Sequence, residues 1–134
     1  MLKLDMTDMS EIPNGYFDYI IANHVMEHII DDKKAVEEMT RCLKDDGEII
    51  LSFPVYENLE ETYEDSSIIS PEERLKAFGQ EDHVRKYGMD YVKRYESYGL
   101  EVKTFISRNE LTESERNQLG ILAGDKMMIC KKRR

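Results

Sequence analysis

Short apolar runs alternate with amphipathic stretches along the first half of the chain. Residues 16–23 are a run of aromatic and β-branched side chains that follows an Asn-Gly turn pair. Such a run, without strict alternation of apolar and polar positions, predicts a strand buried on both faces of a parallel sheet. A helix is predicted from Asp31 or Asp32 to about Leu43, because its apolar positions recur at helical spacing.

The segments that follow complete a βαβ unit. We expect Asp45-Asp46-Gly47 to end the helix, and residues 48–53 to form a second buried strand that Pro54 terminates. Strand, helix and strand within about 40 residues predict parallel strands joined by a right-handed crossover.

The second half of the chain is more polar and begins with an acidic stretch, residues 55–70, which is expected to be a long loop or a poorly packed helix. The elements predicted after it are a short helix from Pro71 with Ser70 as its cap, a helix at 88–98 with Met89, Val92 and Tyr95 inward, a strand at 100–107, a polar segment at 108–124 with one helical turn after Thr112, and a strand at 126–131. This order predicts one α/β domain over residues 1–134, with 55–87 as an insert or lid region and a β-hairpin near the C-terminus.

Composition narrows the class of protein. The chain has 134 residues, enough for one domain, and a formal net charge of −9, which argues against a nucleic-acid partner. No apolar run approaches the roughly 20 residues that span a bilayer, and the first residues lack the features of a secretory signal. We therefore expect a cytoplasmic protein without a membrane partner. Its two cysteines are expected to be buried and reduced.

Several short motifs occur in a fixed order along the chain. They are Asp5-Met6-Thr7-Asp8, Phe17-Asp18-Tyr19-Ile20-Ile21, His24-Val25-Met26-Glu27-His28-Ile29, Arg41-Cys42-Leu43-Lys44-Asp45-Asp46-Gly47 and Pro54, with residues 78–88 later. In this order they resemble the middle and late motifs of class I S-adenosylmethionine-dependent methyltransferases of the type 11 kind. The resemblance covers nearly the whole chain.

The resemblance implies a truncated Rossmann-like methyltransferase sheet, with strands equivalent to 4-5-7-6 of the family and a C-terminal antiparallel hairpin. The family's glycine-rich cofactor loop has no counterpart, because the seven glycines are scattered and no Gly-x-Gly occurs. One edge of strand 16–23 should then be exposed, and such an edge is a pairing site. We expect either a homodimer through this strand or an N-terminal segment, residues 2–6, that folds back onto it.

The resemblance also implies a cofactor, S-adenosylmethionine, and residues that bind it. Asp5 and Met6 correspond to the positions that contact the adenine, and Asn23 and His24 to those near the methionine portion. Each has a plainer interpretation, which is a turn-capping role for Asp5 and a packing role for His24.

Two further polar groups are candidates for chemistry. His83 and Arg85 are predicted to be catalytic residues of the acceptor pocket, with His83 as a general base; the alternative is ordinary hydrogen bonding between surface elements. Glu27-His28 invites a metal or acid–base interpretation, but no third ligand lies nearby in the sequence. We therefore predict no metal site there.

The function predicted from these residues is methyl transfer from S-adenosylmethionine to a small molecule, by a chain that is incomplete on its own. Two alternatives remain: a non-catalytic dimerisation or binding module derived from a methyltransferase, and a fragment that binds an adenine-containing ligand weakly through Asp5 and Met6. Methyl transfer requires alignment and at most one proton removal, so the absence of a nucleophile motif does not discriminate between them.

Overall fold

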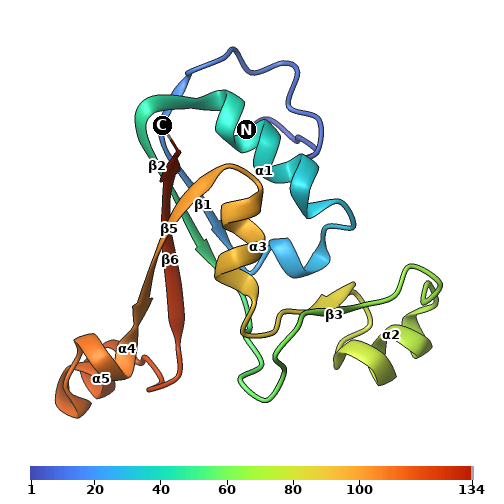
Figure 1. Ribbon diagram of the computed structural model, residues 1–134, viewed down its shortest axis with the longest axis vertical. Helices are drawn as coiled ribbons and strands as arrows, with labels where there is room; N and C mark the ends of the chain where they lie inside the picture. The colour runs from blue at the N-terminus through green and yellow to red at the C-terminus, as the bar shows by residue number, and fades with distance from the viewer. Residues whose placement is uncertain (134) are drawn as a thin grey trace.

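A four-stranded sheet in the order β1-β2-β6-β5 forms the centre of the protein (Figure 1). The computed structural model describes residues 1–133. β1 and β2 are parallel, and the β2–β6 and β5–β6 pairs are antiparallel. The predicted α/β fold, with strands in the order 4-5-7-6 and a C-terminal antiparallel hairpin, is therefore confirmed. The strands of this sheet are β1 (Phe17–Asn23), β2 (Leu43–Ser52), β5 (Leu100–Ile106) and β6 (Lys126–Lys132).

Two helices cover one face of the sheet. Buried side chains of α1 and α3 share one hydrophobic core with alternate positions of the strands, among them Ile49, Leu51 and Met128. The helices are η1 (Met26–His28, a 3₁₀ turn), α1 (Asp32–Cys42), α2 (Pro71–Phe78), α3 (Tyr91–Ser97), α4 (Ser107–Glu110) and α5 (Glu113–Leu119). None of the helices in residues 1–133 combines the length and the apolar character that crossing a membrane requires.

The opposite face of β1 is exposed. Tyr19 and Ile21 are 64% and 70% exposed, whereas Ala22, which points toward the helices, is 2% exposed. The prediction that this strand is buried on both faces was therefore wrong, because its apolar composition does not reveal which face the helices cover. β1 is also an edge strand of the four-stranded sheet.

The junction between α1 and β2 differs from the predicted turn. α1 ends at Cys42 and β2 begins at the next residue, so Asp45-Asp46-Gly47 lies inside a strand. Phe17 pairs with Leu43 but Tyr19 pairs with Glu48, which makes an irregularity in the β1–β2 ladder. A Cβ at Gly47 would lie 2.7 Å from the Asp18 carbonyl oxygen, so this close approach requires glycine.

Other elements depart from expectation more locally. Residues 2–6 form no strand, and the segment makes one isolated bridge between Asp5 and Asp8. Met89, predicted to point inward, is 48% exposed. The polar segment contains two short helices rather than one turn, and a capping box between Thr112 and Glu115 begins the second.

The predicted insert lies apart from the main sheet (Figure 1). It contains α2 and the short antiparallel pair β3 (Tyr63–Glu64) and β4 (Arg85–Lys86). Residues 55–70 are irregular apart from the two residues of β3, in agreement with the expected loop. The pairing of β3 with β4 was not predicted, because two-residue strands leave no readable pattern in a sequence. The division into one domain with a lid stays a prediction.

Both cysteines are expected to be unreactive in the folded protein. Burial raises the pKa of the Cys130 thiol to about 12, and burial also raises the pKa of Cys42. Because the thiolate is the reactive form, we expect negligible labelling by Ellman's reagent at about pH 8. Both thiols should react once guanidinium chloride unfolds the chain. Fast labelling of the native protein would contradict the burial of these side chains.

Candidate functional site

A hollow at the carboxyl ends of β1 and β2 is the main candidate site, and we call it the strand-end pocket. It has a volume of about 650 Å³, which lies within the usual range for small-molecule sites. Open α/β sheets bind ligands at the carboxyl ends of their parallel strands. The residues that line the pocket are Asn23, His24, Ser52, Phe53, Pro54, Val55, Tyr56, Phe105, Ile121, Gly124, Asp125, Lys126 and Met127.

Asn23 and His24 line the β1 side of this pocket, and their binding of the methionine portion of a cofactor stays a prediction. His24 has a φ of 53°, and it is the one non-glycine residue among 1–133 in the left-handed region. Backbone in this region costs on the order of 1 kcal/mol and is concentrated at functional sites. The His24 amide donates to the Ser52 carbonyl at 2.8 Å, and the Ser52 hydroxyl donates to Asn23 Oδ1. These bonds fix the two strand ends together.

Asp5 and Met6 do not line the strand-end pocket. The Asp5 carboxylate accepts hydrogen bonds from the Thr7 hydroxyl at 2.7 Å and the Thr7 amide at 2.8 Å. These bonds lower the pKa of Asp5, the hydroxyl contributing most. Met6 packs partly against the hydrophobic core. The contacts of Asp5 are those of a turn cap, and a role of either residue in adenine binding stays a prediction.

Arg85 is buried in a structural position, 2% exposed and outside the lining of the pocket. Its guanidinium donates to the carbonyl oxygens of Met26, Ile29 and Ile30 at 2.7, 2.5 and 2.7 Å. These bonds hold the 3₁₀ turn η1 against β4. These contacts are structural and do not involve the pocket, so the catalytic role of Arg85 stays a prediction.

His83 lies against Glu27 and His28, and no pattern in the sequence predicts this contact. One potential ligand atom from each of the three residues lies within 4.8 Å of the others. His83 is 6% exposed, and burial lowers its pKa, with the neighbouring His28 adding to the effect. It does not line the strand-end pocket. We expected no third ligand for Glu27-His28 because none lies nearby in the sequence. The fold brings His83 next to this pair.

An ion-pair cluster lies beside the pocket and includes one of its lining residues, Lys126. Lys126 Nζ and Arg108 Nη2 donate to Glu57 Oε1 at 2.6 and 3.2 Å. These two bonds, that from Lys126 first, lower the pKa of Glu57. They join the loop after β2 to α4 and to the start of β6, which sequence reasoning did not anticipate.

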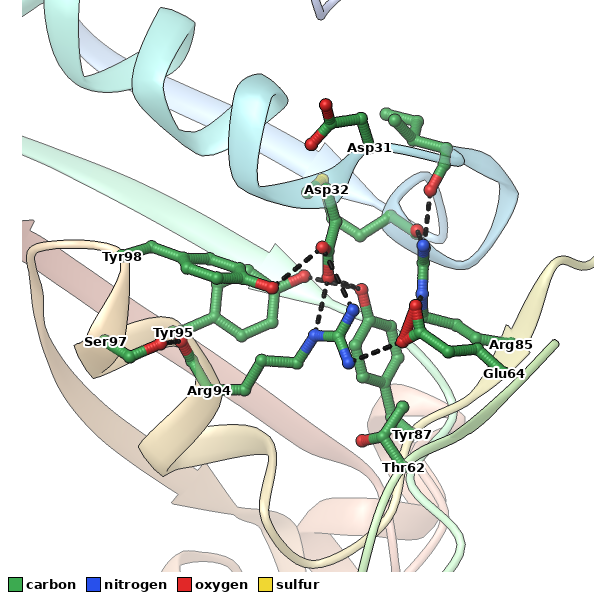
Figure 2. A network of polar contacts seen from close by, with 12 residues as sticks. Asp31, Asp32, Thr62, Glu64, Arg85, Tyr87, Arg94, Tyr95, Ser97 and Tyr98 are labelled. Atoms are coloured by element: carbon green, nitrogen blue, oxygen red, sulfur yellow. Dashed lines mark hydrogen bonds and ion pairs between the residues drawn. The ribbon is translucent and has the colours of Figure 1, made fainter. Parts of the chain in front are cut away.

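A buried carboxylate joins α1, α3 and the insert (Figure 2). Asp32, 3% exposed, accepts from Arg94 Nε, Tyr87 Oη and Tyr98 Oη, each at 2.9 Å. The Arg94 guanidinium also pairs with Glu64 at 2.6 Å. Because Tyr87 and Glu64 belong to the insert, this network fixes the insert on the helices.

Acid should weaken this network. Burial alone would raise the pKa of Asp32, but hydrogen bonding from Arg94 and the charges of Arg85 and Arg94 outweigh it, so the pKa is lowered. The resulting stability is complete above the unfolded pKa of about 3.9 and is lost as the pH falls through the lower folded value. We expect the urea concentration at the midpoint of unfolding to decrease as the pH is lowered below about 4. This decrease should be less steep in Asp32→Asn than in the parent. An equal slope in both proteins would contradict this assignment.

The sheet order and the pocket at the carboxyl ends of its parallel strands define a Rossmann-like α/β protein. Residues 1–51 match the methyltransferase domain family. The chain thus has the fold of class I S-adenosylmethionine-dependent methyltransferases, and the resemblance noted in its motifs is confirmed. Comparison with curated proteins gives no match.

Solved structures support the same fold at low sequence identity. The YcgJ protein of Bacillus subtilis aligns with 96% of this chain at 18% identity and a TM-score of 0.57. A methyltransferase dependent on S-adenosylmethionine from Archaeoglobus fulgidus aligns with 98% of this chain at 14% identity and a TM-score of 0.60. The 1,6-didemethyltoxoflavin-N1-methyltransferase of Burkholderia thailandensis, solved with S-adenosylhomocysteine, aligns with 98% of this chain at 11% identity and a TM-score of 0.60. The chain spans 69%, 66% and 49% of these three chains, respectively.

Proposed function

We propose that this chain takes part in methyl transfer from S-adenosylmethionine to a small molecule that binds in the strand-end pocket. The observation that carries the proposal is the position of this pocket. It opens beside His24 at the carboxyl end of β1, and it is mainly lined by apolar and aromatic side chains with a few polar groups. That is the usual make-up of a small-molecule site.

The residues at the end of β1 partly fit the cofactor. The backbone at His24 is in the left-handed region, which is concentrated at functional sites, and the strand-end pocket lies beside Asn23 and His24. We propose that these two residues hold the methionine portion and that Asp5 and Met6 approach the adenine. S-adenosylmethionine would supply an activated methyl group. Because no Gly-x-Gly occurs in the chain, we propose that the rest of the cofactor site comes from another polypeptide segment.

His24 is better placed than His83 to accept a proton from the acceptor. Its side chain is 60% exposed, and its Nδ1 lies 3.5 Å from Glu27 Oε1. A carboxylate at that distance orients the ring, which leaves Nε2 for a hydroxyl or amine in the pocket. We therefore propose His24 as the general base, with Glu27 as the residue that positions it.

Calorimetric titration with S-adenosylmethionine and S-adenosylhomocysteine tests the proposal. We expect binding that is weak, on the order of millimolar, because the glycine-rich cradle is missing, and weaker still in Asn23→Ala. Glu72→Gln, on the exposed face of α2, is the matched control. Absence of any binding at millimolar ligand would contradict a cofactor site in this chain.

A non-catalytic dimerisation module is the second candidate, because β1 offers an unpaired edge and the exposed side chains Tyr19 and Ile21. Unpaired edges of this kind are sites of strand addition. If β1 pairs between copies, sedimentation will give a dimer that Ile21→Lys converts to a monomer. A dimer that binds no cofactor would favour this candidate, whereas a monomer that binds cofactor would exclude it.

A further inference from the structure

We propose that Glu27, His28 and His83 form a binding site for one divalent transition-metal ion of the Zn²⁺ or Co²⁺ type. The three residues come from η1 and from the loop before β4, which the Arg85 hydrogen bonds hold together. No metal role was predicted from the sequence, because the third ligand comes from a distant segment. The site is defined by these side chains and does not depend on methyl transfer.

The geometry of the three side chains is close to that of a ligand set. Their potential ligand atoms lie within 4.8 Å of one another, and His28 Nε2 lies 3.8 Å from Glu27 Oε1. Ligand atoms on one zinc ion, at about 2.0–2.2 Å each, lie roughly 3.5 Å apart. A rotation that moves each side chain by about 1 Å would therefore complete the site.

The tautomer of His28 suits a metal ligand. His28 Nδ1 lies 3.0 Å from the backbone carbonyl oxygen of Asp82. A carbonyl can only accept, so Nδ1 carries the proton in the neutral ring and Nε2 keeps its lone pair toward Glu27. Hydrogen bonding from the second ring nitrogen to a carbonyl is the usual support of a metal-binding histidine.

Glu27 supplies an independent indication of a ligand. Its residue is 2% exposed, and its Oε2 has no hydrogen-bond partner among residues 1–133. A buried carboxylate oxygen without a partner is costly, and buried charges are normally paired or coordinate metals. Oε1 lies near His24 and His28, and an ion bound there would give this carboxylate the partner that its other oxygen lacks.

The ligand types select the class of metal. Two imidazoles and one carboxylate match three-ligand zinc sites, which keep a fourth position open. Mg²⁺ and Ca²⁺ prefer sites made wholly of oxygen ligands. His24 lies between the cluster and the strand-end pocket, since it lines the pocket and contacts Glu27. A bound ion would thus stand beside the pocket.

Metal binding by the chain, without an affinity tag and after removal of metal by chelation, tests the proposal. We expect Co²⁺ to bind one per chain, with visible d–d absorption, and Zn²⁺ to displace it. Glu27→Gln and His83→Ala should each lose at least about 100-fold in affinity, whereas Glu72→Gln should bind as the parent does. Glu27→Gln keeps the size of the side chain. Circular dichroism and the thermal midpoint of unfolding, both measured without metal, will establish whether this variant is folded.

Three results would overturn the proposal. The first is a folded parent chain that shows no saturable Co²⁺ or Zn²⁺ binding below millimolar concentration. The second is equal affinity in the parent and in folded Glu27→Gln, which would place the ion elsewhere. The third is equal affinity for Mg²⁺, which would contradict imidazole ligation. None of these readouts requires cofactor or acceptor, so the proposed methyl transfer can fail while the metal site stands.

Discussion

Replacing Asp32 with asparagine is expected to lower the free energy of unfolding by about 3 kcal/mol or more. The carboxylate accepts two hydrogen bonds from Arg94 and one each from Tyr87 and Tyr98. Asparagine removes the negative charge and one acceptor oxygen, so Arg94 keeps only Glu64 as an anionic partner and a tyrosine hydroxyl loses its acceptor in a buried site. Urea unfolding followed by circular dichroism measures the change.

A matched variant and a double-mutant cycle separate the network from a general effect of charge. Asp45, whose side chain is 99% exposed, is the control, and Asp45→Asn should change the stability by less than about 0.5 kcal/mol. In an Arg94→Met background, Asp32→Asn should cost at least about 1 kcal/mol less than in the parent. If Asp32→Asn lowers the free energy of unfolding of the parent by less than about 1 kcal/mol, the network contributes little to the stability of the fold.

Gly88→Ala is expected to destabilise the protein by about 1–3 kcal/mol through overpacking. A Cβ at this position would lie 2.6 and 2.7 Å from the backbone carbon and oxygen of Glu61, and 2.9 Å from the carbonyl oxygen of Leu59. These are backbone atoms, so no side-chain rotation can relieve the contact. The Met89 amide also donates to the Leu59 carbonyl at 2.8 Å, which holds the two segments together.

The effect should be local to the insert. We expect faster hydrogen exchange at the Tyr56 amide, which donates to Tyr87 across the same contact, together with a lower urea midpoint. Gly124→Ala is the matched control, because no atom lies within 4 Å of its added Cβ and its φ is not positive. If both variants unfold at the same urea concentration, the close approach at Gly88 is not the constraint described.

The central sheet could be predicted from the sequence because its strands carry a local pattern. The apolar runs at 17–23 and 48–52, the helix between them and the two late strands all lie where expected. The irregular pairing around Gly47 could not be predicted, because it depends on the approach of Asp18 from another strand. The exposed face of β1 could not be predicted for a similar reason. Whether a strand face is buried depends on which distant elements pack against it, and the strand's own residues do not reveal this.

The candidate site divides along the same line. Asn23 and His24 could be placed at the end of a strand from the sequence, and the structure puts both in the lining of the strand-end pocket. The contact of His83 with Glu27 and His28, the Glu57 ion pairs with Lys126 and Arg108, and the partners of Asp32 were not found. Each joins residues that are distant in the sequence, and composition and periodicity carry no information about such pairs.

The position of β6 has a consequence for the order in which the chain folds during synthesis. β6 comes last of the sheet strands in sequence, yet it lies between β2 and β5. β1 and β2 can therefore pair early, while β5 has no neighbour in the sheet until residues 126–132 have been made. The nascent chain must carry β5 as an unpaired strand, and closure of the sheet waits for the final strand to insert.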